Sequence, residues 1–174
     1  MARTLIAYYS RRGNNYSNGR IVNLPVGNTE VIAGKIREIT GGDLFEIKTT
    51  MPYPEDYTEA THVARDELNG NARPQLAATL DNMDSYELIY LGYPNWWGMM
   101  PMAVFTFLES YDFSGKTIMP FCTHEGSELG NSEHDIQRLC KNAHVMPGLA
   151  IRGSSVANVD NNLAIWLKKS QVKE

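Results

Sequence analysis

The sequence predicts an α/β fold: a doubly wound, five-stranded parallel sheet with helices on both of its faces. Short apolar runs alternate with segments of helical periodicity from one end of the chain to the other, which is typical of βαβ units. Right-handed crossover connections leave few ways to wind five such units. The 174 residues suit a single domain spanning residues 1–174, long enough to bury one substantial core.

The five expected strands are short apolar runs, each stopped by polar or turn-forming residues. The first run, 5–9, ends at Ser10, and a turn of Arg, Gly and Asn residues follows it. The run over 87–92 is apolar throughout after its first residue, as in a strand that is buried on both faces. We expect the strands at 5–9, 43–49, 87–92, 116–122 and 148–151.

Helical periodicity separates these runs. Gly41 follows the first periodic segment and ends that helix. Pro101 is expected as the first residue of the third helix, and Ser132 as the N-cap of the fourth, because these residue types are preferred at those positions. The expected helices cover 28–40, about 55–69, 101–108, 132–140 and 159–167.

Composition excludes several classes of protein. The net charge of −4 lacks the basic excess of a nucleic-acid binder. Cys122 and Cys140 are too few for a disulfide framework, and no CxxC pair supplies a zinc knuckle or a redox dithiol. The apolar stretch near the N-terminus, about six residues, is too short for a signal peptide or a membrane span. We therefore expect a cytoplasmic protein without a nucleic-acid or membrane partner.

The loop between the first strand and the first helix, from Ser10 to Gly27, suits a phosphate group. Ligands of open α/β sheets bind beyond the carboxyl ends of the strands, where this loop begins. Ser10 and Thr29 carry hydroxyl groups, and Asn28 and Thr29 open the helix, whose free N–H groups and dipole attract an anion. An ordinary N-cap after a polar loop is an equally good interpretation of this segment alone.

The loop after the third strand, Pro94-Asn95-Trp96-Trp97-Gly98, holds two adjacent tryptophans. A monomer rarely exposes two such side chains without a function. Large flat rings beside a glycine make a stacking platform for a planar ligand. The alternative is structural, with one tryptophan covering the sheet edge and the other forming a dimer contact.

The loop after the fourth strand is rich in hydrogen-bond donors and glycine, and its residues are Thr123, His124, Glu125, Gly126 and Ser127. Glycine allows the backbone to approach a ligand closely. The His-Glu pair is not followed by the second histidine of HExxH, and the serine lacks the GxSxG spacing. Neither a metal site nor a catalytic nucleophile is therefore predicted. No GxGxxG dinucleotide fingerprint follows the first strand either.

A phosphate loop first, an aromatic loop third and a Gly/Thr loop fourth together resemble the flavodoxin family over nearly the whole chain. The segments 91–98 and 123–127 are similar to one branch of flavodoxin-like proteins, although the compact phosphate loop of the family looks split by an insertion after Ser10. The resemblance implies the strand order 2-1-3-4-5 and non-covalently bound FMN. It places the phosphate on the helix that starts at Asn28 and the isoalloxazine ring between the two later loops.

Three functions stay open on this evidence. The first is an FMN-binding redox protein that transfers electrons or acts as an oxidoreductase, with a redox partner protein or a small-molecule acceptor. The second is an enzyme that uses NAD(P)H to reduce quinones, and the third is a binding or interaction module of the same fold without flavin. The small net charge of −4 weakens the case for an electrostatically steered carrier. The second tryptophan leaves a homodimer open.

Overall fold

The computed structural model describes residues 3–171. At its centre is a parallel sheet, in which the strands follow the order β4-β1-β5-β6-β7 and β8 also pairs with β6. Every pair of neighbouring strands is parallel. The bounds of the strands are Thr4–Tyr8 for β1, Asp43–Glu46 for β4, Leu88–Pro94 for β5, Thr117–His124 for β6, His144–Val145 for β7 and Leu149–Arg152 for β8.

The last position of the sheet is shared by two short strands. β7 pairs with the beginning of β6, and β8 pairs with its end. Pro147 lies between β7 and β8 and cannot donate a ladder hydrogen bond, so the strand is interrupted there. With β7 and β8 in one position, the order is 2-1-3-4-5. The predicted fold class is therefore confirmed.

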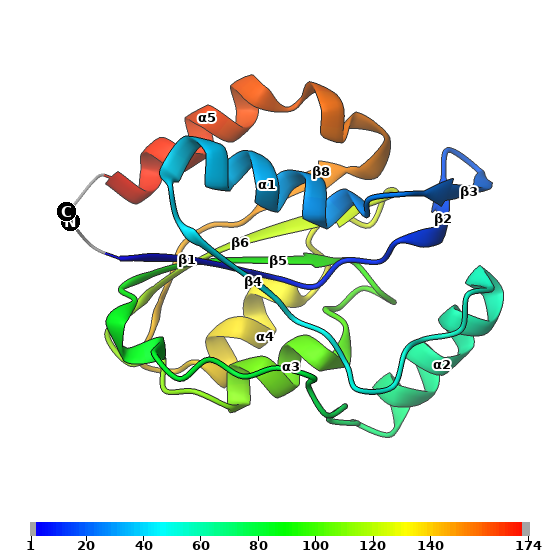
Figure 1. Cartoon of the computed structure of the whole chain (residues 1–174), viewed down its shortest axis with the longest axis horizontal. Coiled ribbons are helices and arrows are strands. Elements are labelled where there is room, and N and C mark those ends of the chain that lie inside the picture. The colour runs from blue at the N-terminus through cyan, green and yellow to red at the C-terminus, as the bar shows by residue number, and fades with distance from the viewer. Residues whose placement is uncertain (1–2, 172–174) are drawn as a thin grey trace.

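Helices cover both faces of the sheet (Figure 1). α1 (Asn28–Thr40) and α5 (Asp160–Lys168) lie on one face, while α3 (Met102–Glu109) and α4 (Ser132–Leu139) lie on the other. α2 (Tyr57–Asn69) lies to the side, toward the carboxyl ends of the strands. Within residues 3–171, no helix is long and apolar enough to cross a membrane.

Each helical layer encloses its own hydrophobic core against the sheet. Ile6 of β1, Ile32 of α1 and Leu163 of α5 are fully buried in one core. Leu91 of β5 and Phe105 of α3 are buried in the other. The strands are therefore apolar on both faces, as a parallel sheet between two helical layers requires.

Two predicted helix starts are wrong. Pro101 precedes α3 with an extended backbone, at ψ 143°, rather than forming its first turn. The N-cap of α4 is Asn131, and Ser132 is the first helical residue. The Ser132 hydroxyl donates to the Leu129 carbonyl oxygen and accepts the Tyr93 hydroxyl proton at 2.8 Å. It satisfies a buried tyrosine because β5 and α4 are packed together at that point.

Two other boundaries also differ from the prediction. α2 begins at Tyr57 because the Asp56 side chain caps it, accepting the Glu59 N–H at 2.9 Å. β4 ends at Glu46 because its partner β1 ends at Tyr8. The ladder therefore stops before residue 49, where the strand was expected to end.

The segment expected as a loop between β1 and α1 contains a β-hairpin, β2 (Gly13–Ser17) and β3 (Arg20–Leu24). Its turn residues, Asn18 and Gly19, have φ values of +49° and +81°. This is the type I′ geometry for which Asn-Gly is preferred. The hairpin projects beyond the carboxyl ends of the strands, on the same side as α2 (Figure 1).

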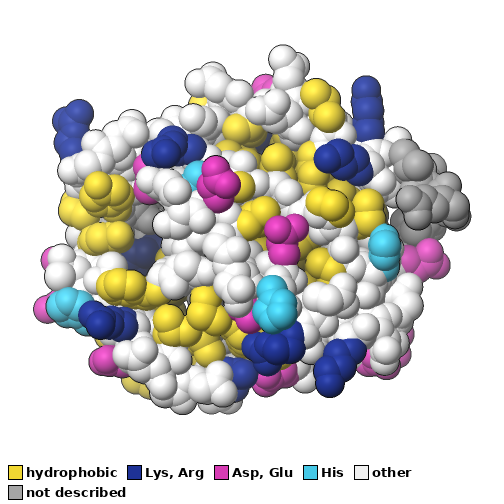
Figure 2. Space-filling view, turned by 180° about the vertical axis from the view of Figure 1, so that it is seen from behind, with side chains coloured by type: hydrophobic (Ala, Val, Ile, Leu, Met, Phe, Trp, Pro, Cys, Tyr) yellow, Lys and Arg dark blue, Asp and Glu magenta, His cyan; other side chains and the backbone are white. Residues whose placement is uncertain are grey.

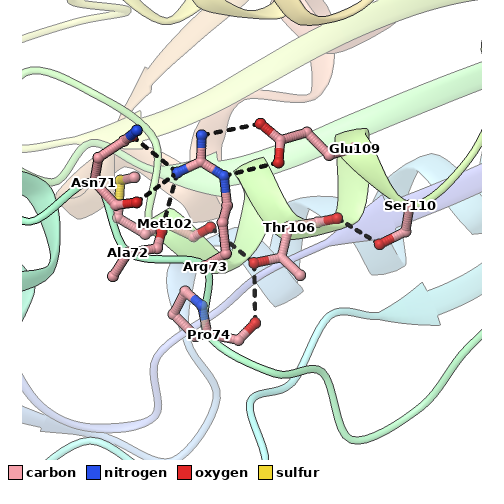
Figure 3. A network of polar contacts seen from close by, with 8 residues as sticks. All are labelled: Asn71, Ala72, Arg73, Pro74, Met102, Thr106, Glu109 and Ser110. Atoms are coloured by element: carbon pink, nitrogen blue, oxygen red, sulfur yellow. Dashed lines mark hydrogen bonds and ion pairs between the residues drawn. The ribbon is translucent and has the colours of Figure 1, made fainter.

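Arg73 fastens the segment after α2 to α3 (Figure 3). Its guanidinium donates to both carboxylate oxygens of Glu109, at 2.9 Å each, and to the carbonyl and side-chain oxygens of Asn71. The Thr106 hydroxyl donates to the Pro74 carbonyl oxygen at 2.9 Å. A bidentate pair is the geometry in which a partly exposed ion pair contributes most. The chain that returns from α2 to the sheet is thus held in place.

Candidate functional site

Two adjoining cavities lie at the carboxyl ends of the strands. The smaller, about 120 Å³, lies between the start of α1 and the end of β6. The larger, about 450 Å³, lies between α2 and the loop after β5. Arg11, Tyr57, Asn95 and Trp96 line both, so the two cavities adjoin, and together they are called the pocket. Its polar end has Asn28, Thr29, Thr123, His124 and Glu125, and its aromatic end has Ala60, Ala64, Trp97 and Gly98.

The pocket brings together residues predicted from three separate loops. Those at the smaller cavity are Asn28, Thr29, Pro94, Asn95, Trp96, Thr123, His124 and Glu125. Those at the larger are Asn95, Trp96, Trp97, Gly98 and Ser127. Ser10 and Gly126 line neither cavity and instead hold neighbouring groups.

Ser10 closes the start of α1. The N-cap residue, Gly27, has no side chain, and Ser10 Oγ takes its place by accepting the Glu30 backbone N–H at 3.1 Å. A Cβ on Gly27 would collide with Ser10 Oγ and come within 2.6 Å of the Arg11 carbonyl oxygen. Glycine is needed here so that the end of β1 can reach the helix. A direct contact between Ser10 and a ligand stays a prediction.

A buried hydroxyl pair joins the two sides of the polar end. Thr29 Oγ1 and Thr123 Oγ1 lie 2.7 Å apart, and the two residues are only 1% and 5% exposed. Nearby, Glu125 Oε1 is buried without a hydrogen-bond partner among residues 3–171, while Oε2 faces Arg152 at 3.9 Å. An unpaired buried acceptor is costly. This oxygen lies against Gly153, where an added Cβ would come within 2.6 Å of it, and it is not exposed to the cavity.

His124 is held by its own loop, because Nδ1 accepts the Gly126 backbone N–H at 2.9 Å. Burial lowers the pKa of His124 below its ordinary value of 6.5, and Arg152 lowers it further, against the opposing effect of Glu128 and Glu125. The side chain is therefore neutral at pH 7. Because Nδ1 is an acceptor, its proton is on Nε2, which supplies a further donor to the polar end.

Trp96 is anchored by aromatic contacts behind the pocket. Its ring lies 5.2 Å from Tyr9 and 5.1 Å from Tyr53 between centroids, at interplanar angles of 79° and 86°. Tyr9 and Tyr53 also meet edge to face, at 88°. Such perpendicular arrangements are favoured by the ring quadrupoles. Trp96 lines both cavities and thus forms a fixed wall of the pocket.

A tight turn follows Trp96. Trp96 and Met99 exchange backbone hydrogen bonds of 2.8 and 3.1 Å, and Trp97 and Gly98 have φ values of +56° and +77°. The turn is therefore type I′, with a bulky residue where asparagine is usual, at a cost of about 1 kcal/mol or more. Asn95 supports this shape, because its Oδ1 accepts the Gly98 N–H at 2.9 Å and its Nδ2 donates to the loop after β6 at 2.8 Å.

Trp97 bridges this turn to α2. Its indole Nε1 donates to the Thr61 carbonyl oxygen at 3.0 Å, and the Arg65 guanidinium lies 5.4 Å from its ring centroid. The residue is 50% exposed. The two adjacent tryptophans thus have different positions: Trp96 packs against tyrosines, and Trp97 closes the aromatic end against α2.

Residues of the hairpin and α2 complete the pocket and were not predicted. Arg11 donates to three carbonyl oxygens, of Asn14, Pro54 and Glu55, and so joins the hairpin to the segment before α2. Tyr16 of β2 stacks on Tyr57 of α2, with centroids 6.2 Å apart at 27°. The Asn-Gly pair could have indicated the hairpin, but nothing local indicates that it folds over the pocket. The unpredicted lining residues are Arg11, Asn15, Tyr16, Tyr57, Ala60, Thr61 and Ala64.

Solved structures of other proteins share this architecture. A candidate flavoprotein from Bacteroides eggerthii is 26% identical, with a TM-score of 0.78 over 99% of this chain and 100% of that one. Another from Bacteroides uniformis is 27% identical, with a TM-score of 0.72 over 96% and 98%. A flavoprotein from Lactobacillus acidophilus, solved in complex with FMN, is 23% identical, with a TM-score of 0.67 over 94% and 99%.

No curated protein sequence matches the chain. A family model described as flavodoxin matches residues 22–170, which cover most of the chain. The match includes α1, the loop after β5 and the loop after β6, and therefore much of the pocket. It agrees with the strand order and with the place of the pocket at the carboxyl ends of the strands. The chain belongs to the flavodoxin family.

Proposed function

We propose that this chain binds FMN non-covalently in the described pocket and acts as a flavin-dependent redox protein. Family membership supports this, as does the FMN complex of the similar Lactobacillus acidophilus flavoprotein. The observation that carries the proposal is a pocket lined from the N-terminus of α1, past the polar side chains at the end of β6, to the aromatic wall of Trp96. That sequence of anion site, polar side chains and flat apolar surface fits a phosphate, a ribityl chain and an isoalloxazine ring.

The start of α1 would hold the phosphate. The first N–H groups of a helix have no partner within it and carry the positive end of its dipole. Ser10 Oγ takes the N–H of Glu30, which leaves the amides of Asn28 and Thr29 to meet an anion. The Asn28 side chain and Thr29 also line the polar end. In this arrangement Ser10 positions the start of α1, and Asn28 and Thr29 contact the phosphate.

The aromatic end would hold the ring. Bound FMN would supply the exchange of one or two electrons, which no side chain of this pocket supplies. Trp96 offers a fixed face for stacking, and the 96–99 turn and α2 limit the access of water. His124 and Glu125 line the polar end, where the Nε2–H of His124 would help to orient the polar part of the flavin.

The charge and shape of the surface bear on whether such a protein passes electrons to a partner protein or to a small molecule. On the face shown in Figure 2, charged side chains of both signs are interspersed with hydrophobic ones. A net charge of −4, with both signs mixed on this face, gives this face little electrostatic steering toward a protein partner. The half-exposed ring of Trp97 beside the aromatic end could stack on a flat substrate, which favours a small-molecule acceptor in the second candidate, NAD(P)H-dependent reduction of a quinone. A redox partner protein remains the alternative acceptor.

FMN binding is tested by the visible spectrum of the purified protein and by titration of the flavin-free protein with FMN. We expect yellow protein and quenching of FMN fluorescence by Trp96. Riboflavin, which lacks the phosphate, should bind at least about tenfold more weakly. A colourless protein that leaves FMN fluorescence unchanged would favour the flavin-free interaction module.

The enzyme is tested separately, by steady-state oxidation of NADPH in the presence of a quinone. Turnover well above that of free FMN would support the reductase. A rate equal to that of free FMN would leave electron transfer to a partner protein as the function. Sedimentation of the loaded protein tests the homodimer, and cell fractionation tests the proposed cytoplasmic location.

A further inference from the structure

The loop after β6 depends on an unprotonated histidine nitrogen. Nδ1 of His124 accepts the Gly126 N–H at 2.9 Å, and a nitrogen that accepts a hydrogen bond carries no proton. An imidazolium has N–H groups on both nitrogens. Protonation would therefore set one N–H against another and end this contact.

The same loop carries the contacts that close the polar end. The Glu125 carbonyl oxygen accepts from Arg152 at 3.1 Å, and Glu125 Oε2 accepts the Asn18 N–H of the hairpin at 3.4 Å. Gly126 has φ +143°, a conformation that other residues rarely adopt. Because Glu125 lies between His124 and Gly126, a change in their contact moves its carboxylate and its link to the hairpin.

The groups facing His124 come from several elements. Arg152 of β8 is its register partner across the sheet, and Glu125 and Glu128 belong to its own loop. Arg11 and Tyr57, at the end of β1 and on α2, line the same cavity. Burial and Arg152 favour the neutral imidazole and outweigh the two carboxylates, so the pKa of His124 is lowered.

We infer that His124 is a positioning residue for the flavin: its neutral form shapes the 124–128 loop into the pocket wall, and its protonation opens that loop and releases FMN. The inference rests on the proposed binding of FMN. It adds a pH-dependent step to that binding and assigns it to one hydrogen bond. His124 would thus govern how tightly the cofactor is bound in mildly acidic conditions.

The test is an FMN titration of flavin-free protein between pH 8 and pH 5. The wild-type affinity should fall by up to about tenfold per pH unit below the pKa of free-protein His124. His124→Asn keeps an acceptor, Oδ1, at the place of Nδ1 but does not titrate. It lacks the Nε2–H donor, so it should bind FMN more weakly than wild type at pH 8, with an affinity that does not fall between pH 8 and pH 5 beyond the fall due to the FMN phosphate. His124→Ala lacks the acceptor and should bind at least about tenfold more weakly throughout.

Two controls isolate the imidazole. The FMN phosphate itself titrates near pH 6, but equally for all variants, so the ratio of their dissociation constants removes it. His134→Asn changes an exposed histidine on α4 and should leave the wild-type profile intact. Equal pH profiles for wild type and His124→Asn would overturn the inference, as would wild-type affinity in His124→Ala at pH 8.

A second readout needs no flavin. In nuclear magnetic resonance spectra of the free protein, the Gly126 amide signal should shift with the titration of His124, and His124→Asn should abolish that shift. A Gly126 signal that ignores the His124 titration would overturn the inference even if FMN binds. Absence of FMN binding at pH 8 in every variant would instead contradict the proposed function, while this shift would still show that the loop contact is real.

Discussion

The two ends of the pocket are built in different ways. At the polar end, side chains and backbone already satisfy one another. The pairs Ser10–Glu30 and Thr29–Thr123 join separate elements, and the pair His124–Gly126 holds the loop after β6. At the aromatic end, α2 and the 96–99 turn stand apart, and the Trp97–Thr61 hydrogen bond joins them. The polar end is therefore fixed before a ligand arrives, whereas the width of the aromatic end depends on where α2 lies.

This difference assigns different tasks to the two ends. Prearranged groups at the polar end lower the entropy cost of ordering a ligand and determine where its anionic part lies. The residues of α2 that face the aromatic end include Ala60 and Ala64, whose small side chains leave room beside Trp96. Substitutions at the polar end should therefore change affinity, and those at the outer wall should change access to the ring.

Trp96→Ala should have the largest effect, because it removes the ring on which Tyr9 and Tyr53 pack. We expect a loss of about 3 kcal/mol in the free energy of unfolding and at least a tenfold loss of FMN affinity. Urea unfolding followed by circular dichroism measures the first, and fluorescence titration the second. Trp97→Ala is the matched control and should cost less than half as much stability. Equal losses would show that the two tryptophans do not differ as their contacts suggest.

Gly27→Ala tests whether the close approach between the start of α1 and the end of β1 is needed. Its Cβ would collide with Ser10 Oγ and push the end of β1 away from α1, so we expect a loss of about 2 kcal/mol in stability and weaker FMN binding. Gly34, on the same helix, has nothing within 4 Å of an added Cβ. Gly34→Ala should raise stability by roughly 0.5–1 kcal/mol and leave FMN affinity unchanged. Thermal unfolding of both variants decides whether the close approach at Gly27 matters.

Thr29→Val should cost less, about 1–2 kcal/mol, because it leaves the Thr123 hydroxyl buried without its partner. The double variant Thr29→Val, Thr123→Val removes both hydroxyls at nearly constant volume. Its loss of stability should therefore be smaller than the sum of the losses in the two single variants. A double-mutant cycle from urea unfolding measures this coupling. Strict additivity would mean that the 2.7 Å contact does not hold α1 to β6.

The sequence predicted the parts of the molecule that local patterns determine. Asn28 opens a helix, Thr123 directly follows an apolar run, and Trp96 belongs to a tryptophan pair in the loop after another run. All three were predicted at the pocket because these positions meet at one edge of a parallel sheet. Arg11 and Tyr57 were not predicted, because they reach the pocket only once the hairpin and α2 have folded toward it. Their positions depend on tertiary contacts, such as the Arg11 bonds to the carbonyls of the segment before α2.

The different roles of Trp96 and Trp97 could not be predicted for a related reason. Adjacent identical residues have the same local propensity, and the type I′ turn that separates them is unusual at a tryptophan. The turn is held by the Asn95 side chain, which bonds to the loop after β6. Two loops that are distant in the sequence therefore determine which ring faces the tyrosines and which faces α2.

Trp97→Phe should have the smallest effect of the series, and it tests the outer wall directly. It keeps an aromatic ring at the turn but removes the indole N–H that bonds to Thr61, so we expect a loss of about 0.5–1 kcal/mol in stability. Hydrogen exchange of the first turns of α2 should become faster, because that bond ties α2 to the turn. Arg65→Ala is the control: it removes the cation beside the ring and keeps the bond, so exchange in α2 should stay at the wild-type rate. If α2 exchanges at the same rate in all three proteins, the Thr61 bond does not set the width of the aromatic end, and the wall is held by the packing of Ala60 and Ala64 instead.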